Sequence, residues 1–510
     1  MELHLSPIDF AVIALYFVVL IGIGVASLHF AQTRDDYLVA GRRLHFPMFF
    51  ACMAALAVGG AVTVGGAQRG YQVGAAGVWV GGSLGMGLIV LGMLVSSKLS
   101  RLRALSMAEV IERNYGQTAR ILSAVLTIIY TVSLTVVQIV SIGAILEGIV
   151  GWSSTVCMLV GGGVVVFYTF IGGMWSVTMT DLLQFIVKTL GIIILVPIFV
   201  FTNPKIGGVS GFFDKVPPSH LNLGSLGFQG TLYWILLYVP GLVIGQDIWQ
   251  RVFTAKNDKI ARAGTLSAGV YAIIYAIGGV LLGMATAIVV PDLKDPSEAF
   301  STGVATFLPV GVAGVLLAAA IAAAMSVASG TILACSTVVY NDIYLRLFRG
   351  VVTDIEDADG NARVTTKHDV WINRGIAFVL GLIMMGLAVV ISDLFKALDL
   401  AYGFLSGCVF VPVIAGFILK KVSPRAGLVS LAVSFLGVAG TMTYGEVTGQ
   451  PNFAIGGNWP IMVGMALSIV SYTLVTVFDR QRITPNLSPA ERAAEAAATA
   501  AQRAETGSAR

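Results

Sequence analysis

Charged side chains are scarce in this chain. Asp, Glu, Lys and Arg together make up 11% of its 510 residues, whereas 56% are hydrophobic. This composition excludes an ordinary water-soluble domain and is typical of a polytopic membrane protein, so we expect a lipid bilayer to surround most of the chain. The formal net charge is only +4. Its basic residues follow the membrane topology described below and give no reason to invoke a nucleic acid.

Cysteine and histidine are also few. The four cysteines stand singly inside apolar runs with no CxxC pair, and the five histidines lie at the ends of such runs or between them. Neither a disulfide bond nor a zinc site is therefore expected. No connecting segment combines a nucleophile with a base, a pair of reactive carboxylates or a metal-binding cluster. We therefore expect neither an enzyme nor an organic cofactor.

Long apolar runs are what the chain has in abundance. A helix needs roughly 20 apolar residues to cross a bilayer, and the first such run covers about residues 8–28. Twelve more runs centre near residues 57, 86, 133, 163, 192, 240, 277, 325, 382, 410, 435 and 467. The sequence thus predicts an all-α polytopic membrane protein with about thirteen transmembrane helices, and a count of twelve or fourteen stays open. The first run lacks a basic start and a cleavage pattern, so we expect a retained helix.

Basic residues between these runs fall almost entirely on one side of the predicted membrane. The opposite side has only five, which are Arg69, Lys205, Lys215, Lys294 and Lys396. Connections rich in Lys and Arg stay in the cytoplasm. This pattern predicts an N-terminus outside and a C-terminus inside the plasma membrane, which we expect to be a bacterial inner membrane.

Glycine and proline interrupt two of the runs. The second contains Gly59 and Gly60, and the seventh contains the segment YVPG at 238–241 followed by Gly245. Broken membrane helices at corresponding places of two halves point to a midplane binding site in a transporter. The breaks and nearby polar groups give the candidate substrate-binding residues, which are Gly59, Gly60, Gln138, Tyr238, Pro240 and Gln246. Asp247 lies at helical spacing from Arg251, and we expect an ion pair between them.

The two breaks also divide the chain. Each begins a block of five spans, and the blocks are similar in length and opposite in topology. We predict an extra helix and cytoplasmic loop at 1–45, a first inverted repeat at 46–202, an extracellular loop at 203–229 and a second inverted repeat at 230–420. Two C-terminal helices at 421–479 and an Ala-rich cytoplasmic tail at 480–510 follow.

Asp181 is a carboxylate at membrane depth, within the segment GGMWSVTMTDLLQ at 172–184. Such groups cost several kcal/mol unless they face a cavity, a partner or an ion. Two interpretations are open. Asp181 belongs to a cation site, or it lies at the membrane edge and reaches water.

Three segments carry a resemblance to a known family: 172–184, QDIWQRVFTAK at 246–256, and AAAMSVASGTILACSTVVYNDIY at 322–344. With supporting likeness at 35–42 and 106–116, the chain resembles the sodium:solute symporter family, which includes transporters of proline, pantothenate, sugars, sialic acid, iodide and choline. The resemblance implies a leucine-transporter-like five-plus-five inverted repeat, with one extra helix before it and two after. It also implies sodium-coupled uptake of a small polar solute by alternating access.

The resemblance further implies a sodium site. Its ligands map to the backbone carbonyls of Ala55, Val58 and Ala323 and the hydroxyl of Ser326, with Asp181 near the inner exit. The second hydroxyl of the family's pair maps to Val327, which has no oxygen to offer. Either Ser329 or Thr331 compensates for the loss. Sodium is the coupling ion that we expect.

Lys188 is the second unusual group. It follows Asp181 by seven residues, about 10 Å along the same helix face, inside an otherwise apolar run. It pairs with a carboxylate or lines a wet cavity, it is a tethered cation or proton carrier in place of sodium, or it anchors a substrate carboxylate. A lysine can exchange protons when it is buried, so the tethered-cation interpretation implies proton-coupled or sodium-independent transport.

One other class of function stays open. A sensor that uses the transporter fold without transport would normally carry a signalling domain, which the short tail does not provide. Uptake with and without a sodium gradient separates the two classes. The solute is a carboxylate, an amino acid, a quaternary amine or a sugar, and the sequence does not choose among them.

Overall fold

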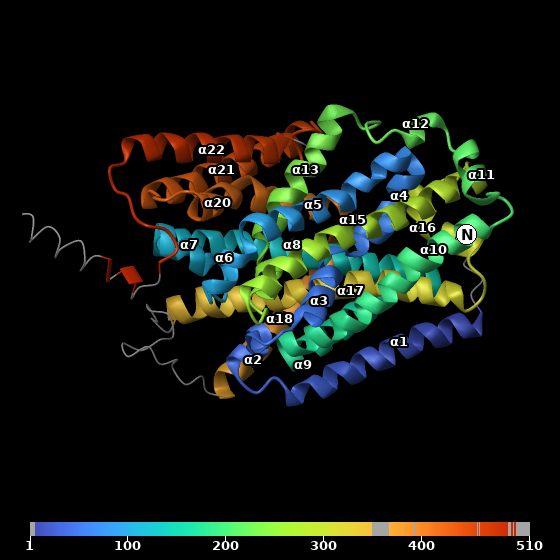
Figure 1. Cartoon of the computed structure of the whole chain (residues 1–510), viewed down its shortest axis with the longest axis horizontal. Helices are drawn as coiled ribbons and strands as arrows, with labels where there is room; N and C mark the ends of the chain where they lie inside the picture. The colour runs from blue at the N-terminus through green and yellow to red at the C-terminus, as the bar shows by residue number, and fades with distance from the viewer. Residues whose placement is uncertain are drawn as a thin grey trace, which may run out of the picture.

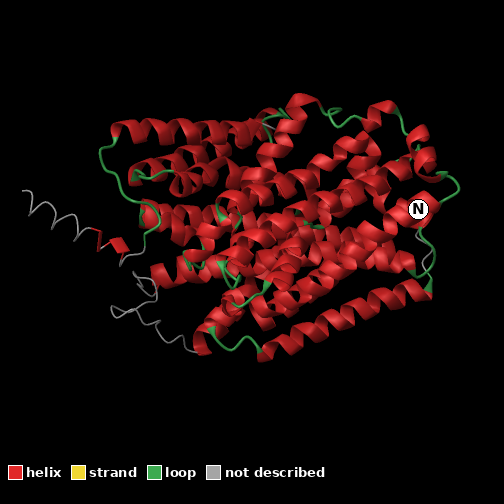
Figure 2. Ribbon diagram, viewed as in Figure 1, coloured by secondary structure: helices red, strands yellow, loops and turns green. Residues whose placement is uncertain are grey.

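The computed structural model describes residues 6–348, 367–391, 394–455, 457, 459–487, 491–492 and 494–495. Figure 2 shows helices and short loops throughout these residues and no strand. Two isolated bridges, Leu44 with Ala255 and Val422 with Ile483, join loops at the ends of helices. The prediction of an all-α fold is confirmed. Most of the predicted tail at 480–510 lies outside the described residues, and so does Thr365, a position used below to test the membrane orientation.

The membrane crossings are built from long helices and from shorter ones that continue them. They are α1 (Pro7–Ala26), α3 (Phe46–Ala57), α4 (Gly60–Val73), α5 (Val78–Leu94), α8 (Gln117–Val150), α9 (Ser154–Lys188), α10 (Val196–Thr202), α13 (Gly227–Ile244), α14 (Gln246–Val252), α15 (Asp258–Val289), α17 (Val312–Val338), α18 (Lys367–Val390), α19 (Leu394–Phe404), α20 (Phe410–Ile418), α21 (Pro424–Thr448) and α22 (Trp459–Phe478). Short helices connect them: α2 (Arg34–Val39), α6 (Ser96–Arg101), α7 (Met107–Tyr115), α11 (Gly208–Lys215), α12 (Pro218–Leu221) and α16 (Ala299–Phe307). Wider π-helical turns continue α9, α17 and α19 at Thr189–Leu195, Val339–Phe348 and Leu405–Val409.

The number of crossings follows from two glycines. Eleven helical runs of the described chain are long and apolar enough to span a membrane. One of them, 60–94, turns at Gly74, and another, 154–202, turns at Gly173; both glycines have a positive φ. Helix α4 has only 14 residues, so it can cross only together with α3, and α5 then forms the next crossing. With 154–202 divided at Gly173, the described chain has helices for thirteen crossings, the number near which the prediction lay. The start of α1 and the end of α22 lie at opposite ends of the bundle, as an odd number requires (Figure 1).

The two ends of the bundle differ in the helices that cover them. Helices α11 and α12 cover one end, and α2, α6 and α7 lie at the other (Figure 1). We call these the α11 end and the α7 end. Lys98, Arg101 and Arg113 belong to α6 and α7, so basic residues predicted to be cytoplasmic gather at the α7 end. The orientation of the two ends in a membrane stays a prediction.

The first predicted break is confirmed. Helix α3 ends at Ala57 and α4 begins at Gly60, and between them Val58 (φ −126°, ψ 100°) and Gly59 (φ −96°, ψ −169°) are extended. The N–H of Gly60 donates to Oε1 of Gln138 on α8 at 2.9 Å. A side chain of a neighbouring helix therefore satisfies a backbone group that the break has freed.

The second break lies four residues after the predicted one. Helix α13 continues through Pro240 and Gly241, and the chain opens only at Gly245 (φ −59°, ψ 127°), after which α14 begins. Pro240 lacks the N–H that would bond the carbonyl of Leu236, yet the helix continues past it. Close to this point the hydroxyl of Ser406 donates to the carbonyl of Leu237 at 2.8 Å. The prediction of a break at Pro240–Gly241 is therefore wrong in position.

Helix α17 is the centre of the bundle. Every residue from Leu316 to Val338 is buried, and the helix packs against α8, α9, α3 and α4. The α3–α4 break thus faces a helix with no solvent-exposed side in that range. The division of the chain into two inverted repeats stays a prediction.

Candidate functional site

The side-chain ammonium of Lys188 lies on three oxygens at the α3–α4 break. Nζ donates to the carbonyl of Ala55 at 2.5 Å, to the carbonyl of Val58 at 3.1 Å and to the hydroxyl of Ser326 at 3.0 Å. The break frees the two carbonyls because Ala55 lies in the last turn of α3 and Val58 in the extended segment that follows it. Lys188 is wholly buried, and it is the last residue of α9 before the π-helical turn.

These three oxygens belong to the predicted sodium ligands. A fourth predicted ligand, the carbonyl of Ala323, is close by. The hydroxyl of Ser326 lies 3.0 Å from this carbonyl and 3.0 Å from that of Ala55. Carbonyl and hydroxyl oxygens suit a hard cation such as sodium. The chain therefore gathers an oxygen set fit for sodium and places its own ammonium on it.

The two residues expected to compensate for Val327 face elsewhere. The hydroxyl of Ser329 donates to the carbonyl of Ser326 at 3.1 Å. The hydroxyl of Thr331 lies 2.7 Å from that of Thr135 on α8. Neither contacts Lys188, so neither adds an oxygen to this set in the structure.

Asp181 is paired with an arginine from α14. Its Oδ2 accepts a hydrogen bond from Nη2 of Arg251 at 3.0 Å, and both side chains are buried. Asp181 is fully shielded from solvent, which excludes the interpretation that it reaches water at the membrane edge. Gly330 makes the pair sterically feasible, because a Cβ there would lie 2.8 Å from the guanidinium.

The predicted ion pair of Asp247 and Arg251 is wrong. Oδ1 of Asp247 accepts a hydrogen bond from the hydroxyl of Tyr130 on α8 at 2.9 Å. Arg251 reaches α9 instead, and only the backbone carbonyl of Asp247 lies near it, at 3.5 Å. The side chain of Asp247 is left facing the central cavity.

That cavity is narrow, about 30 Å³, and it lies beside the α3–α4 break. Its wall includes Gly59 and the polar or aromatic residues Gln138, Tyr238, Asp247 and Tyr402. The rest of the wall is apolar: Leu56, Ala57, Ala61, Val62, Val80, Leu84, Leu134, Leu242, Ile248, Val327 and Leu398. The structure thus brings together three of the candidate substrate residues. A cavity of this volume holds about one or two water molecules, so a solute requires it to expand.

The other three candidates lie outside this wall. Gly60 packs against Ser141, and Pro240 is inside the continuous part of α13. Gln246 ties α14 to the loop before α7: its Oε1 accepts from the N–H of Met107 at 2.7 Å, and its Nε2 donates to the carbonyl of Leu105 at 3.2 Å. We assign Gln246 a structural role at the α7 end.

Aromatic rings separate the cavity from the α11 end. The rings of Trp234 and Tyr238 stack at 5.6 Å, and Tyr238 meets Tyr402 edge-on at 5.0 Å. Beyond them lies a second cavity of about 450 Å³, whose wall includes Arg69, Tyr233, Trp234 and Asp399. We call Trp234, Tyr238 and Tyr402 the aromatic layer.

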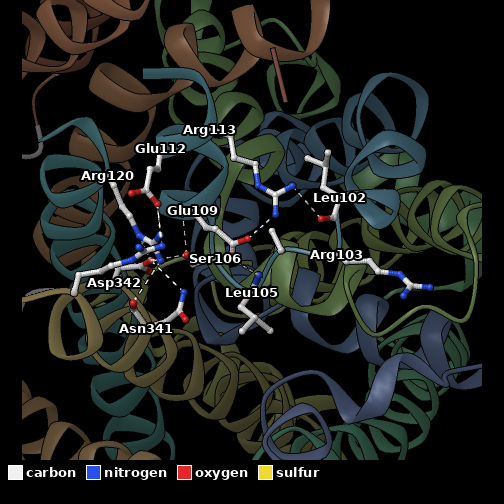
Figure 3. A network of polar contacts seen from close by, with 12 residues as sticks. Leu102, Arg103, Leu105, Ser106, Glu109, Glu112, Arg113, Arg120, Asn341 and Asp342 are labelled. Carbon is white, nitrogen blue, oxygen red and sulfur yellow. Dashed lines mark hydrogen bonds and ion pairs between the residues drawn. The ribbon is translucent and has the colours of Figure 1, made fainter. Parts of the chain in front are cut away.

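Ion pairs close the α7 end (Figure 3). Arg120 of α8 donates from Nε to Oδ1 of Asp342 at 2.8 Å and also pairs with Glu112 of α7. Ser106 donates to the same carboxylate oxygen at 2.9 Å, and Arg346 pairs with Glu112 at 3.1 Å. This α7-end network joins α7, α8 and the π-helical continuation of α17.

Sequence reasoning did not identify the α7-end network as part of the site. Its members lie in two segments that carry the family resemblance, 106–116 and 322–344, and Asp342 and Arg346 follow directly on a long apolar run. The available signal was the presence of opposite charges at the ends of apolar runs that become neighbours in the fold. Which runs become neighbours depends on the tertiary fold.

Comparison with known proteins places the chain among transporters. A family model described as "Sodium:solute symporter family" matches residues 37–437. A sodium/proline symporter of Staphylococcus aureus is 26% identical over 83% of this chain and 84% of that protein. Sodium/glucose cotransporter 4 of Danio rerio is 27% identical over 67% of this chain, which spans 59% of the length of that relative.

Two solved structures share the fold. A Na⁺-coupled sialic acid symporter, in a substrate-bound outward-open state, superposes with a TM-score of 0.77 at 17% identity, over 94% of this chain and 99% of that one. A nucleobase-cation-symport-1 family transporter in a closed conformation gives 0.53 at 15% identity, over 90% and 97%.

The family match covers most of the chain, from the end of α2 to the middle of α21, and contains the α3–α4 break, Lys188, the Asp181–Arg251 pair and the α7-end network. It identifies a membrane transporter rather than an enzyme. The chain belongs to the sodium:solute symporter family.

Proposed function

We propose that this protein takes up a small polar solute together with sodium, by alternating access around the central cavity. The observation that carries the proposal is the position of this cavity. It lies at the α3–α4 break, with the aromatic layer on one side and the α7-end network on the other. A transporter needs such a site between two barriers that open in turn.

The cavity wall favours a solute that both donates and accepts hydrogen bonds. The carboxylate of Asp247 is an acceptor at this wall. The buried hydroxyl of Tyr238 makes no hydrogen bond within the described part of the chain. Buried polar groups are normally satisfied, so a polar solute is a suitable partner for Tyr238. An amino acid, a sugar and a hydroxylated carboxylate all meet this requirement.

Sodium coupling is supported by the family and by the oxygens of Ala55, Val58 and Ser326. The named activities of the two curated relatives, with proline and with glucose, agree on sodium and differ in the solute. We therefore propose sodium as the coupling ion and leave the solute defined by its chemistry. We further propose that the α11 end faces outside and the α7 end faces the cytoplasm.

Uptake into proteoliposomes tests the proposal. Purified protein is assayed with radiolabelled amino acids, sugars and small carboxylates, with an inward gradient of sodium or of choline. We expect concentrative uptake of one class under the sodium gradient only. Tyr238→Phe removes the unpaired hydroxyl and should raise the KM for that solute. Ion currents of channel size without solute uptake would refute the proposal.

A further inference from the structure

The predicted sodium ligands hold an ammonium group of the chain itself. Lys188 Nζ contacts Ala55, Val58 and Ser326, all through oxygen atoms. A primary ammonium and a sodium ion both carry one positive charge and both bind carbonyl and hydroxyl oxygens. The three contacts of Lys188 are therefore the contacts that a sodium ion would make at this place.

The charge balance of the buried side chains around the site disfavours a second cation. Two buried charged side chains act on Lys188, the acidic Asp181 and the basic Arg251. These two form an ion pair, so their formal charges cancel and the ammonium of Lys188 already adds one positive charge. A sodium ion beside that ammonium would add an uncompensated positive charge at membrane depth, where such charges are costly.

Sodium is also short of ligands at this site. Val327 supplies no hydroxyl, and Ser329 and Thr331 are directed to other partners. The oxygens that remain are those that Lys188 contacts and the nearby carbonyl of Ala323. Sodium therefore gains its ligands only when the ammonium leaves them.

We propose that the ammonium of Lys188 and a sodium ion compete for this site, so that it holds one or the other and never both. The inference rests on the proposed function, because it concerns the ion of that same transport cycle. Sodium binds after Lys188 withdraws its side chain from these oxygens. When sodium leaves, the ammonium returns and again contacts the freed oxygens at the α3–α4 break.

Other titratable groups near the site are accounted for. Asp181 and Arg251 are the charged groups that act on Lys188, and they are paired with each other. The thiol of Cys52 on α3 and the hydroxyls of Tyr16 on α1 and Tyr168 on α9 lie near Asp181. These are neutral at physiological pH, so Lys188 is the group whose charge sodium meets.

Sodium binding in detergent or nanodiscs tests the competition directly. Thermal stability is measured against increasing NaCl, with choline chloride to keep the ionic strength constant, because a ligand that binds the folded state raises the melting temperature. Lys188→Met removes the competing charge, and Lys188→Gln does so while keeping a hydrogen-bond donor. Lys259→Met is the matched control, since Lys259 is exposed at the start of α15.

We expect both Lys188 variants to bind sodium about tenfold or more tightly than the native protein, a coupling of ordinary size between two exclusive ligands. Lys259→Met should match the native protein. Equal sodium affinity in native and Lys188 variants, or loss of sodium binding in the variants, would overturn the proposal.

Failure of the proposed function is a separate result. It would appear as absence of solute uptake in the native protein, whereas sodium binding by the variants would still be measurable.

Discussion

Asp181 and Arg251 lie 3.0 Å apart between α9 and α14, with both side chains removed from solvent. This ion pair joins the helix that carries Lys188 to the helix that begins after the second break. It also neutralises the carboxylate that the sequence placed near the sodium site. Asp181 therefore acts on the cation through the local charge balance, while Lys188 contacts the oxygens of Ala55, Val58 and Ser326 directly.

Asp181→Asn is expected to destabilise the protein by about 3–5 kcal/mol, because it leaves a buried guanidinium without its partner. The double variant Asp181→Asn with Arg251→Gln should regain part of this loss, since it removes both charges. Chemical or thermal unfolding in nanodiscs measures the difference. In uptake assays Asp181→Asn should weaken cation dependence more than solute recognition. A single variant as stable as the native protein would show that the pair does not hold α9 to α14.

Ser326 and Ser329 form a matched pair on α17. Ser326→Ala removes an oxygen of the cation site, and a hydrogen bond to a charged group is worth about 1.5–3 kcal/mol. We expect the sodium concentration for half-maximal uptake to rise about tenfold or more, with a smaller change in the KM for solute. Ser329 bonds its own helix and Tyr168 and does not contact Lys188, so Ser329→Ala should change either value by less than about twofold. Similar effects of the two variants would contradict the assigned site.

Gln138 holds the α3–α4 break open by accepting from the N–H of Gly60. Gln138→Leu leaves that buried N–H unpaired, at a cost of about 1–3 kcal/mol, and we expect a higher KM for solute and a lower melting temperature. Gln138→Glu keeps an acceptor oxygen and should retain more uptake than Gln138→Leu. Gln229→Leu, at an exposed position of α13, is the control. Normal uptake by Gln138→Leu would remove Gln138 from the site.

The α7-end network should restrain opening of that end. Asp342→Asn removes the charge that binds Arg120, and we expect faster labelling of the buried thiol of Cys335, which lies seven residues earlier on α17. Mass spectrometry after a short exposure to a permeant thiol reagent measures the rate. Asp258→Asn breaks an exposed ion pair with Arg101 and should leave labelling unchanged, because such pairs contribute little. Unchanged labelling in Asp342→Asn would exclude a gating role.

The membrane orientation is tested by substituted cysteines. Ser210 and Ser297 are exposed beyond α10 and before α16, and Lys256 is exposed in the loop before α15. The four native cysteines are buried, which gives a low background. An impermeant thiol reagent should label Ser210→Cys and Ser297→Cys in intact cells, and it should not label Lys256→Cys or Thr365→Cys. Labelling of Lys256→Cys would reverse the orientation.

The sequence by itself determined the class of protein and the first break, and it predicted about thirteen crossings. Apolar runs of about 20 residues are expected to become helices in a bilayer, because a helix satisfies its backbone groups within the segment itself. Adjacent glycines in such a run, Gly59 and Gly60, mark the place where a helix is interrupted. The family resemblance supplied the positions of the oxygen ligands, and the family match confirms the resemblance itself.

Only the tertiary structure decided which polar groups meet. Spacing along one helix suggested that Asp247 pairs with Arg251, but α8 and α9 offer Tyr130 and Asp181 as partners, and no local pattern reveals them. The second break lies at Gly245 and not at Pro240, where α13 continues and Ser406, far along the chain, donates to a carbonyl of that helix. Lys188 was recognisable as unusual from its apolar surroundings. Its place on the oxygens of Ala55, Val58 and Ser326 depends on the packing of α9 against α3 and α17, which brings residues more than a hundred positions apart into contact.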